Sequence, residues 1–380
     1  MTEPAPIAVY VHWPYCARIC PYCDFNVVRE RGREAQKAAL ITAMTRDLEA
    51  QADRLGPRRL ASIFFGGGTP SLMPPEAAKA LIETAYRLFP SPDGIEITLE
   101  ANPTDAETAR YQAFAQAGVN RLSLGIQSLD DAALRFLGRD HSAAEARRAV
   151  EAAQGVFGRV SIDLIYARPG QSASAWRAEL DQALALGPEH VSPYQLTIEP
   201  GTAFGRAAQR GVLVQPPEET QEDLFDLTQD VLSAAGYQAY EVSNHARGPT
   251  ARSAHNLNIW RGLEYVGIGP GAHGRLNLTG ARTATIAHRA IPDYIAAVER
   301  HGIGFDAVEV LSPTEAAEER LLLGLRTLEG VPLTEMSALD LSDRIQSLSQ
   351  DGFVVMEDGR LIATARGRKL LDAVIRALLV

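Results

Sequence analysis

Three cysteines are the residues of this chain best suited to metal chemistry. Cys16, Cys20 and Cys23 are the only cysteines among its 380 residues, and they lie within eight consecutive positions. An odd number so closely spaced cannot form a set of disulfides, so we interpret them as metal ligands. Their spacing, C-x3-C-x2-C, suits three corners of one iron–sulfur cubane and leaves the fourth iron open to a small ligand.

Two other interpretations of these cysteines stay open at this point. A structural zinc site normally has four protein ligands, and His12 could provide the fourth. The cysteines could also be inert and buried. The glycine-rich and polar motifs later in the chain favour the cluster, because neither zinc nor simple burial accounts for them.

These later motifs each follow an apolar run that predicts a β-strand. They are Gly66-Gly67-Gly68-Thr69-Pro70, Glu100-Ala101-Asn102-Pro103 and Gln127-Ser128. Ligands of parallel α/β sheets bind where the carboxyl ends of the strands meet. We therefore expect these motifs and the cysteines, which follow the first strand, to form one site.

The elements that must position this site recur as strand–helix units. Short β-branched or aromatic runs precede Ala/Leu/Glu-rich stretches, and after the long first unit they start roughly 30 residues apart, which is the length of a parallel crossover. The runs are Ile7–Trp13, Ile63–Phe65, Gly94–Glu100, Arg121–Ile126, Val160–Tyr166 and Val191–Ile198. Six units are too few to close an eightfold barrel, so the predicted fold is α/β, an open partial (βα)6 barrel.

The chain is long enough for a second unit beside the barrel. We expect the barrel over 1–215, a connecting region over 216–311 that begins with the helix Glu218–Ala235, and a C-terminal domain over 312–380. Ser312-Pro313-Thr314-Glu315 predicts a helix start, Asp358-Gly359 a hairpin, and Arg366–Leu379 a last helix. Helices followed by a β wing predict a winged-helix-like α+β domain, which serves for packing or as a lid.

Charge and hydropathy exclude several classes of partner. The net charge of −10 and pI near 5.4 argue against binding of nucleic acid, which requires clustered Lys and Arg. No apolar run approaches the roughly 20 residues of a membrane-spanning helix, and residues 1–6 lack the charged and apolar segments of a secretion signal. We expect a cytoplasmic location.

The segment Tyr10-Val-His-Trp-Pro-Tyr, together with Cys16–Cys23, resembles the signature of the radical S-adenosyl-L-methionine (SAM) superfamily. Nearly the whole chain is similar to the oxygen-independent coproporphyrinogen III oxidase family within it. The resemblance implies a [4Fe-4S] cluster on the three cysteines and SAM at the open iron. That family has two branches, the oxidases and a group of haem chaperones.

Three features favour the chaperone branch. Phe25 stands where the oxidases carry a further cysteine, and only fifteen residues precede Cys16, where the oxidases have a long extension. The segment His255-Asn256-Leu257-Asn258-Ile259-Trp260 resembles the haem-binding motif H-N-x-x-Y-W of the chaperones, with Ile259 in place of tyrosine. The resemblance implies haem binding by His255, Asn256 and Trp260, with His255 as an axial ligand and Trp260 as a stacking surface.

The same resemblance assigns a set of SAM contacts. Arginine suits the SAM carboxylate, and acidic groups suit its ammonium and ribose. Each residue taken alone could equally be a turn, cap, surface or packing residue. The assigned residues are Gly67, Gly68, Thr69, Glu100, Gln127, Arg139, Asp163 and His273. Tyr10 and Tyr22 flank the cysteines, so we expect them to pack on the cluster or on the adenine of SAM.

The resemblance supports one main function and two alternatives. The main one is a haem chaperone that carries the cluster and SAM and passes haem to an acceptor such as a respiratory haem protein, with a separate electron donor for the cluster. The first alternative is an enzyme, oxidative decarboxylation of coproporphyrinogen III, and the second is radical SAM chemistry on an unrelated substrate. Whether the protein is an enzyme therefore stays undecided here, and no catalytic residue is assigned.

Overall fold

A computed structural model describes residues 3–91, 94–278 and 280–380, so Met1 and Thr2 of the first expected unit lie outside the described residues. The centre of the fold is a run of parallel strands, each hydrogen-bonded to the next. In sheet order they are β1 (Pro6–Trp13), β4 (Arg59–Gly67), β5 (Glu96–Ala101), β6 (Arg121–Gln127), β7 (Arg159–Tyr166) and β8 (His190–Gln195).

Further strands extend this sheet at both sides. Beside β1 come β11 (Glu264–Ile268), which is parallel to it, and then the antiparallel β12 (His273–Leu278), β13 (Ala281–Ala287) and β14 (Phe305–Val310). Beside β8 come β10 (Asn244–Ala246) and β9 (Gln238–Glu241). The described residues thus form a 12-stranded sheet that starts at β14 and ends at β9 without closing. The predicted open partial barrel is confirmed.

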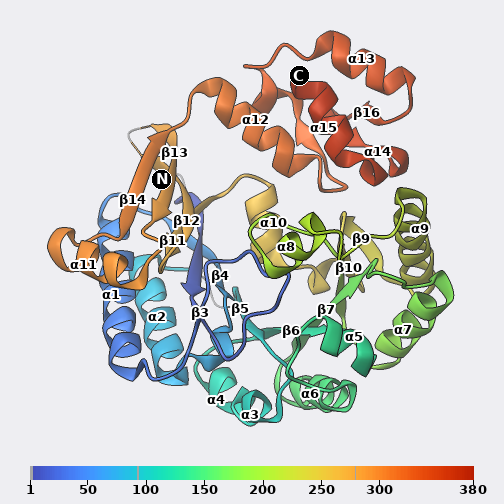
Figure 1. Cartoon of the computed structure of the whole chain (residues 1–380). Helices are drawn as coiled ribbons and strands as arrows, with labels where there is room; N and C mark the ends of the chain where they lie inside the picture. Colours follow the sequence, from blue (N-terminus) through green and yellow to red (C-terminus); the bar gives the residue numbers. More distant parts are fainter. Residues whose placement is uncertain (1–2, 92–93, 279) are drawn as a thin grey trace.

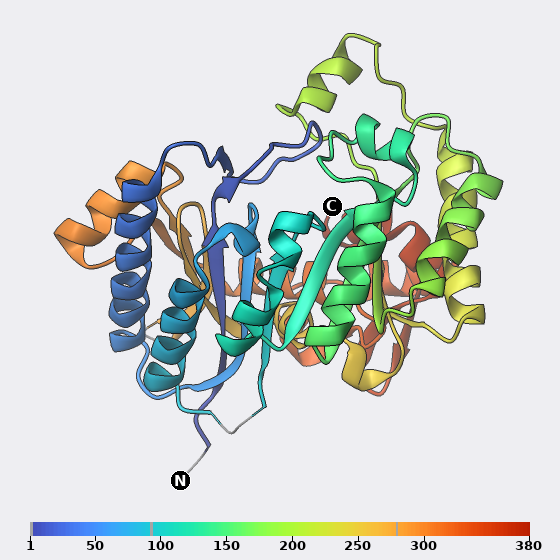
Figure 2. The same cartoon turned by 90° about the horizontal axis from the view of Figure 1, so that it is seen from below.

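Helices cover the convex side of the curved sheet. Figures 1 and 2 show them as an outer arc around the strands. The longer ones are α1 (Glu34–Asp53), α2 (Pro75–Leu88), α6 (Ala143–Val156), α7 (Ala173–Ala185), α9 (Glu218–Ala234) and α11 (Ile291–His301). The shorter ones are α3 (Asp105–Thr108), α4 (Tyr111–Gln116) and α5 (Asp131–Phe136). Two further short helices, α8 (Ala203–Gln209) and α10 (Ala254–Trp260), lie inside this arc in Figure 1. Of the described helices, none is long and apolar enough to cross a bilayer.

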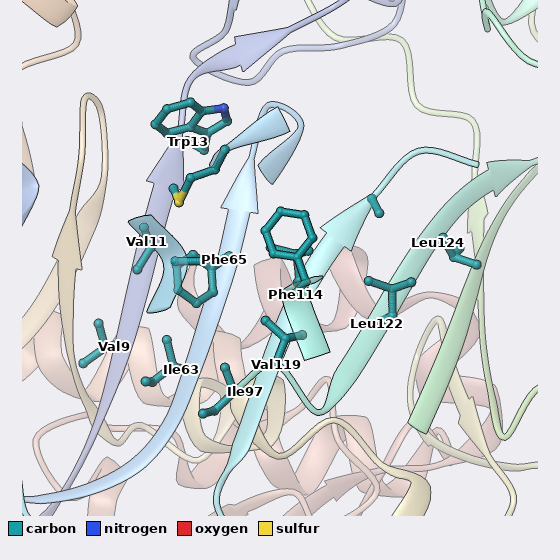
Figure 3. Close-up of a cluster of buried hydrophobic side chains, with 14 of the residues drawn as sticks. Val9, Val11, Trp13, Ile63, Phe65, Ile97, Phe114, Val119, Leu122 and Leu124 are labelled. Atoms are coloured by element: carbon teal, nitrogen blue, oxygen red, sulfur yellow. The ribbon is translucent and has the colours of Figure 1, made fainter. Parts of the chain in front are cut away.

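The main hydrophobic core lies between the sheet and these outer helices. In β1 the apolar residues Val9, Val11 and Trp13 alternate with Tyr10 and His12, so the apolar set faces the helices. Figure 3 shows the same outward-facing layer continuing across the neighbouring strands. Its labelled members on β4, β5 and β6 are Ile63, Phe65, Ile97, Leu122 and Leu124, and Phe114 of α4 and Val119 before β6 belong to the same cluster.

The opposite, concave face of the strands is polar. Tyr10 lies beside Phe64 in the β1–β4 register, Glu100 beside Ser123, and Asp163 beside Ser192. Strand alternation places these residues on the face turned away from the apolar layer. Ionisable groups therefore gather inside the open barrel, where a ligand can reach them.

The C-terminal segment folds around a hydrophobic core of its own, which includes Leu321, Leu361 and Leu378. Its elements are α12 (Pro313–Gly324), β15 (Val331–Pro332), α13 (Ser342–Gln350), β16 (Val354–Glu357), β17 (Arg360–Ala363), α14 (Ala365–Lys369) and α15 (Leu371–Leu379). The strands pair in the order β15-β17-β16. Ser312 caps α12 in a complete capping box with Glu315, as its sequence predicts.

The last helix differs from the sequence expectation. The chain breaks at Leu370, whose φ of −116° and ψ of 33° separate α14 from α15. Thr364 caps α14, and the apolar residues of α15 then turn as a group into the C-terminal core. Sequence periodicity could not predict this break, because it depends on how α15 packs into the C-terminal core.

Candidate functional site

The cysteine loop follows β1 directly. Cys16 ends the short strand β2 (Tyr15–Cys16), which pairs with β3 (Val28–Arg29), and the Cys23 N–H donates to the Cys20 carbonyl over 3.2 Å. Cys16 is buried, Cys20 and Cys23 are partly exposed, and all are free thiols. They line one cavity of about 450 Å³ at the carboxyl ends of the parallel strands.

The donor set of this cavity fits an iron–sulfur cluster better than zinc. His12, the candidate fourth zinc ligand, does not line the cysteine cavity. Its Nδ1 lies 3.1 Å from the Tyr10 hydroxyl and its Nε2 lies 2.9 Å from the Asn26 carbonyl oxygen, so both nitrogens are engaged. Three thiols without this histidine match a cubane with one open iron.

Arg139 joins the cysteines to the neighbouring strands. Its Nη1 donates to Cys20 Sγ over 3.3 Å, and its Nη2 donates to the Gly125 carbonyl over 2.9 Å and to Asn102. Asn102 in turn donates to the Thr69 hydroxyl over 3.2 Å. The guanidinium brings positive charge to a site where thiolates or a ligand carboxylate would carry negative charge.

Two carboxyl groups face the same cavity. Burial raises the pKa of Glu100 to about 8, and the charge of Asp163 adds to this effect. Burial also raises the pKa of Asp163 to about 6, against hydrogen bonds from Ser192 and Ser123. These groups can accept hydrogen bonds from the ammonium and hydroxyl groups of a polar ligand, and in their protonated form they can donate to its hydroxyl oxygens.

The backbone between these side chains is specialised for close approach. Gly67 has a φ of +105°, and a Cβ there would lie 2.6 Å from the His12 ring, so glycine is required. Gln127 has a positive φ of 60°, which is uncommon for a residue with a side chain. Gly67, Gly68, Thr69 and Gln127 all line the cysteine cavity, as does Tyr22.

Several lining residues were not selected from sequence. Ser123 of β6 and Tyr194 and Gln195 at the end of β8 line the cysteine cavity. The rule that ligands bind at the carboxyl ends of parallel strands could have found Tyr194 and Gln195, since they end a predicted strand.

A neighbouring cavity of about 770 Å³ lies against α10. His255, Asn256, Ile259 and Trp260 line it, because residues four apart share a helix face. It adjoins the cysteine cavity, and the lining residues common to both are Asp24, Phe25, Gly67 and Glu100.

The N-terminus of α10 is fixed from the strands. The Ser253 side chain accepts from the Asn256 N–H, and the Glu96 carboxylate accepts the His255 N–H over 2.9 Å. Burial alone would raise the pKa of Glu96, but Arg121, these helix N–H groups and Arg159 hold it below its usual value. The buried carboxylate therefore anchors the helix that carries His255.

His255 is held in one orientation. Its Nδ1 is hydrogen-bonded to Ser62 Oγ at 3.0 Å, and its ring stacks on Phe64 with centroids 5.0 Å apart. Burial lowers the pKa of His255 to about 4, so the imidazole is neutral near pH 7. Among the described residues no hydrogen-bond partner occupies Nε2. A neutral imidazole with one nitrogen fixed is suited to bind iron through the other.

Two residues assigned to SAM lie elsewhere in the structure. Tyr10 and His273 line the α10 cavity together with His255 and do not line the cysteine cavity. The remaining residues of the SAM set line the cysteine cavity. The structure thus brings the predicted residues together in two adjoining groups.

The C-terminal segment holds the other end of α10. Arg320 Nη1 donates to the Trp260 carbonyl over 2.8 Å. Arg261, directly after the helix, donates through Nε to Glu329 over 2.8 Å. The wall of the α10 cavity therefore depends on both structural units.

Comparisons with known proteins agree with this geometry. Residues 10–183 match the model of the radical SAM superfamily, and residues 311–370 match the HemN C-terminal domain. The chain is 39% identical over 396 aligned positions to radical S-adenosyl methionine domain-containing protein 1, mitochondrial, of Bos taurus, covering 99% of this chain and 89% of that protein.

Bacterial proteins named haem chaperone HemW are also similar. The Mycobacterium tuberculosis protein is 35% identical, with 98% of this chain and 95% of its own length covered, and the Escherichia coli protein is 40% identical, with 74% and 73% covered. The solved structure of E. coli coproporphyrinogen III oxidase HemN superimposes with a TM-score of 0.81 at 21% identity, covering 99% of this chain and 90% of that one. That likeness establishes the fold.

Proposed function

The chain belongs to the radical SAM superfamily and to its HemW-like family, and on that premise we propose that it binds haem in the α10 cavity and passes it to an acceptor protein. The adjoining cysteine cavity would hold the cluster and SAM. The two adjoining cavities would then hold the cargo and the cofactors separately within one open barrel.

Within the cysteine cavity each group has a distinct task. Cys16, Cys20 and Cys23 would ligate a [4Fe-4S] cluster, which when bound can supply an electron to SAM at its open iron. Arg139 would balance negative charge, while Glu100 and Asp163 would hold the ligand's ammonium and hydroxyl groups. Gly67 leaves room for the backbone to approach the ligand.

The orientation of His255 is the observation that carries the haem proposal. Ser62 holds Nδ1, burial keeps the ring neutral, and the residue lines a cavity with an aromatic wall. Trp260, Phe64 and Tyr265 in that wall offer flat apolar surfaces to a porphyrin. Binding of an iron porphyrin requires both an axial ligand for the iron and apolar surfaces for the ring.

The test is an anaerobic haem titration of the cluster-loaded protein, followed by Soret absorbance. We expect stoichiometric binding by the wild type, and binding at least about tenfold weaker, with an altered Soret maximum, in His255→Ala. His301→Ala, at the exposed end of α11, is the matched control and should bind as the wild type does.

A parallel assay with coproporphyrinogen III distinguishes the oxidase alternative. A chaperone binds haem and releases no CO2 from coproporphyrinogen. Absence of haem binding together with conversion of coproporphyrinogen would refute the proposal. Transfer is tested separately, by loss of the Soret band from the loaded protein when a haem-free acceptor is added.

A further inference from the structure

The lining of the α10 cavity is electrostatically uneven. Its acidic residues, Asp24 and Glu100, belong to the part that it shares with the cysteine cavity. Arg289 lines only the α10 cavity, and among the described lining residues it is the only Lys or Arg. An anion that enters the α10 cavity is therefore attracted to Arg289.

The backbone beneath Arg289 is fixed. Asn26 Nδ2 donates to the Arg289 carbonyl over 2.9 Å and also to the Pro270 carbonyl over 2.9 Å. The Gly271 N–H donates over 3.0 Å to the carbonyl of His288, the residue directly before Arg289. These bonds tie the β13–α11 connection to the cysteine loop and to the loop before β12, so Arg289 is presented from a fixed position.

The Arg289 side chain itself is exposed to solvent. In the described part of the chain its guanidinium has no ion-pair or hydrogen-bond partner, whereas neighbouring His288 pairs with Asp306 at 3.2 Å. His273 lines the same cavity as Arg289, and it pairs in register with Ile286, three residues before Arg289. His273 is exposed too.

We propose that Arg289, with His273 beside it, binds the propionate carboxylates of haem and so sets the direction in which haem enters the α10 cavity. This inference rests on the proposed function and adds a specificity site to it. The carboxylated edge of the porphyrin lies at Arg289, and the uncharged edge points toward Phe25 and the cysteine cavity. Arginine is suited to this task because its planar fork matches a carboxylate.

The experiment compares haem with haem dimethyl ester, in which both carboxylates are blocked while the iron and ring are kept. Each probe is titrated against the full-length, cluster-loaded protein and followed by Soret absorbance. The variants are Arg289→Gln, Arg289→Lys and the control Arg300→Gln, which removes one exposed arginine from nearby α11 without touching the cavity.

We expect the wild type and Arg300→Gln to bind haem roughly fivefold or more tightly than the ester. Arg289→Gln should lose this preference by weakening haem binding alone, and Arg289→Lys should keep part of it because the charge remains. Equal preference in Arg289→Gln and wild type, or no preference in the wild type, would overturn the inference while leaving haem binding intact. Binding of neither probe by the wild type would instead overturn the proposed function, and this inference with it.

Discussion

At the scale of single residues, the proposed haem binding rests on the pair Ser62 and His255. Ser62 is fully buried on β4 and also receives a hydrogen bond from Asn258 Nδ2 at 3.4 Å. The hydroxyl thereby links two residues of α10 to a rigid strand. In the proposed function Ser62 would act on the haem iron only through His255, as a positioning residue.

Ser62→Ala tests this role. We expect haem binding to weaken by about tenfold and the Soret maximum to shift, because the imidazole loses the partner that fixes its orientation. Ser161→Ala is a matched control, since the Ser161 hydroxyl lies 2.7 Å from Nδ1 of the buried His190, which does not line the cavity. Equal weakening in both variants would mean that the effect comes from general loss of packing.

At the scale of elements, α10 is a short helix held at both ends by other parts of the chain. Seven residues are too few for a helix that is stable by itself. Glu96 on β5 binds its first N–H groups, and Arg320 on α12 binds its last carbonyl. The position of the haem motif thus depends on these two contacts.

Arg320→Ala removes the second contact. We expect faster amide hydrogen exchange in residues 254–260 and roughly threefold to tenfold weaker haem binding, while SAM binding stays unchanged. Lys369→Ala is the control, because Lys369 forms an ion pair between α14 and Asp226 of α9, at 2.6 Å and away from α10. Unaltered exchange in 254–260 would show that α12 does not hold this helix.

At the scale of the whole molecule, the open barrel keeps the two cavities adjacent but with different walls. The cysteines and Arg139 line one, and α10 lines the other. The loop that carries the cysteines is tied to the loop before β12 through Asn26 and Pro270. Loss of the cluster should therefore leave the wall around His255 in place.

Replacing Cys16, Cys20 and Cys23 together by serine tests this separation. We expect the variant to lose cluster iron and the visible iron–sulfur absorbance, since hydroxyl groups do not replace thiolates as ligands. Haem binding to the α10 cavity should persist within about threefold of the wild type. A variant that stays folded by circular dichroism but no longer binds haem would show that the two cavities act as one site.

The sequence by itself determined the six parallel strands β1, β4, β5, β6, β7 and β8, with their last residues placed to within three positions, but not the strands that residues 216–311 add to the sheet. Alternation in β1 is a local property, and so is the spacing of the cysteines, because both follow from backbone geometry over a few residues. The capping box of α12 is local for the same reason.

Only the tertiary structure decided which cavity each residue lines. Tyr10 and His273 belong with His255 because β11 and β12 add to one edge of β1 while α10 packs on β4 at its other edge, which no local pattern encodes. The role proposed for Arg289 likewise depends on a hydrogen bond to Asn26, 263 positions earlier in the chain. Strand alternation determines the face of the sheet on which a side chain lies, but long-range packing determines which other elements lie against that face.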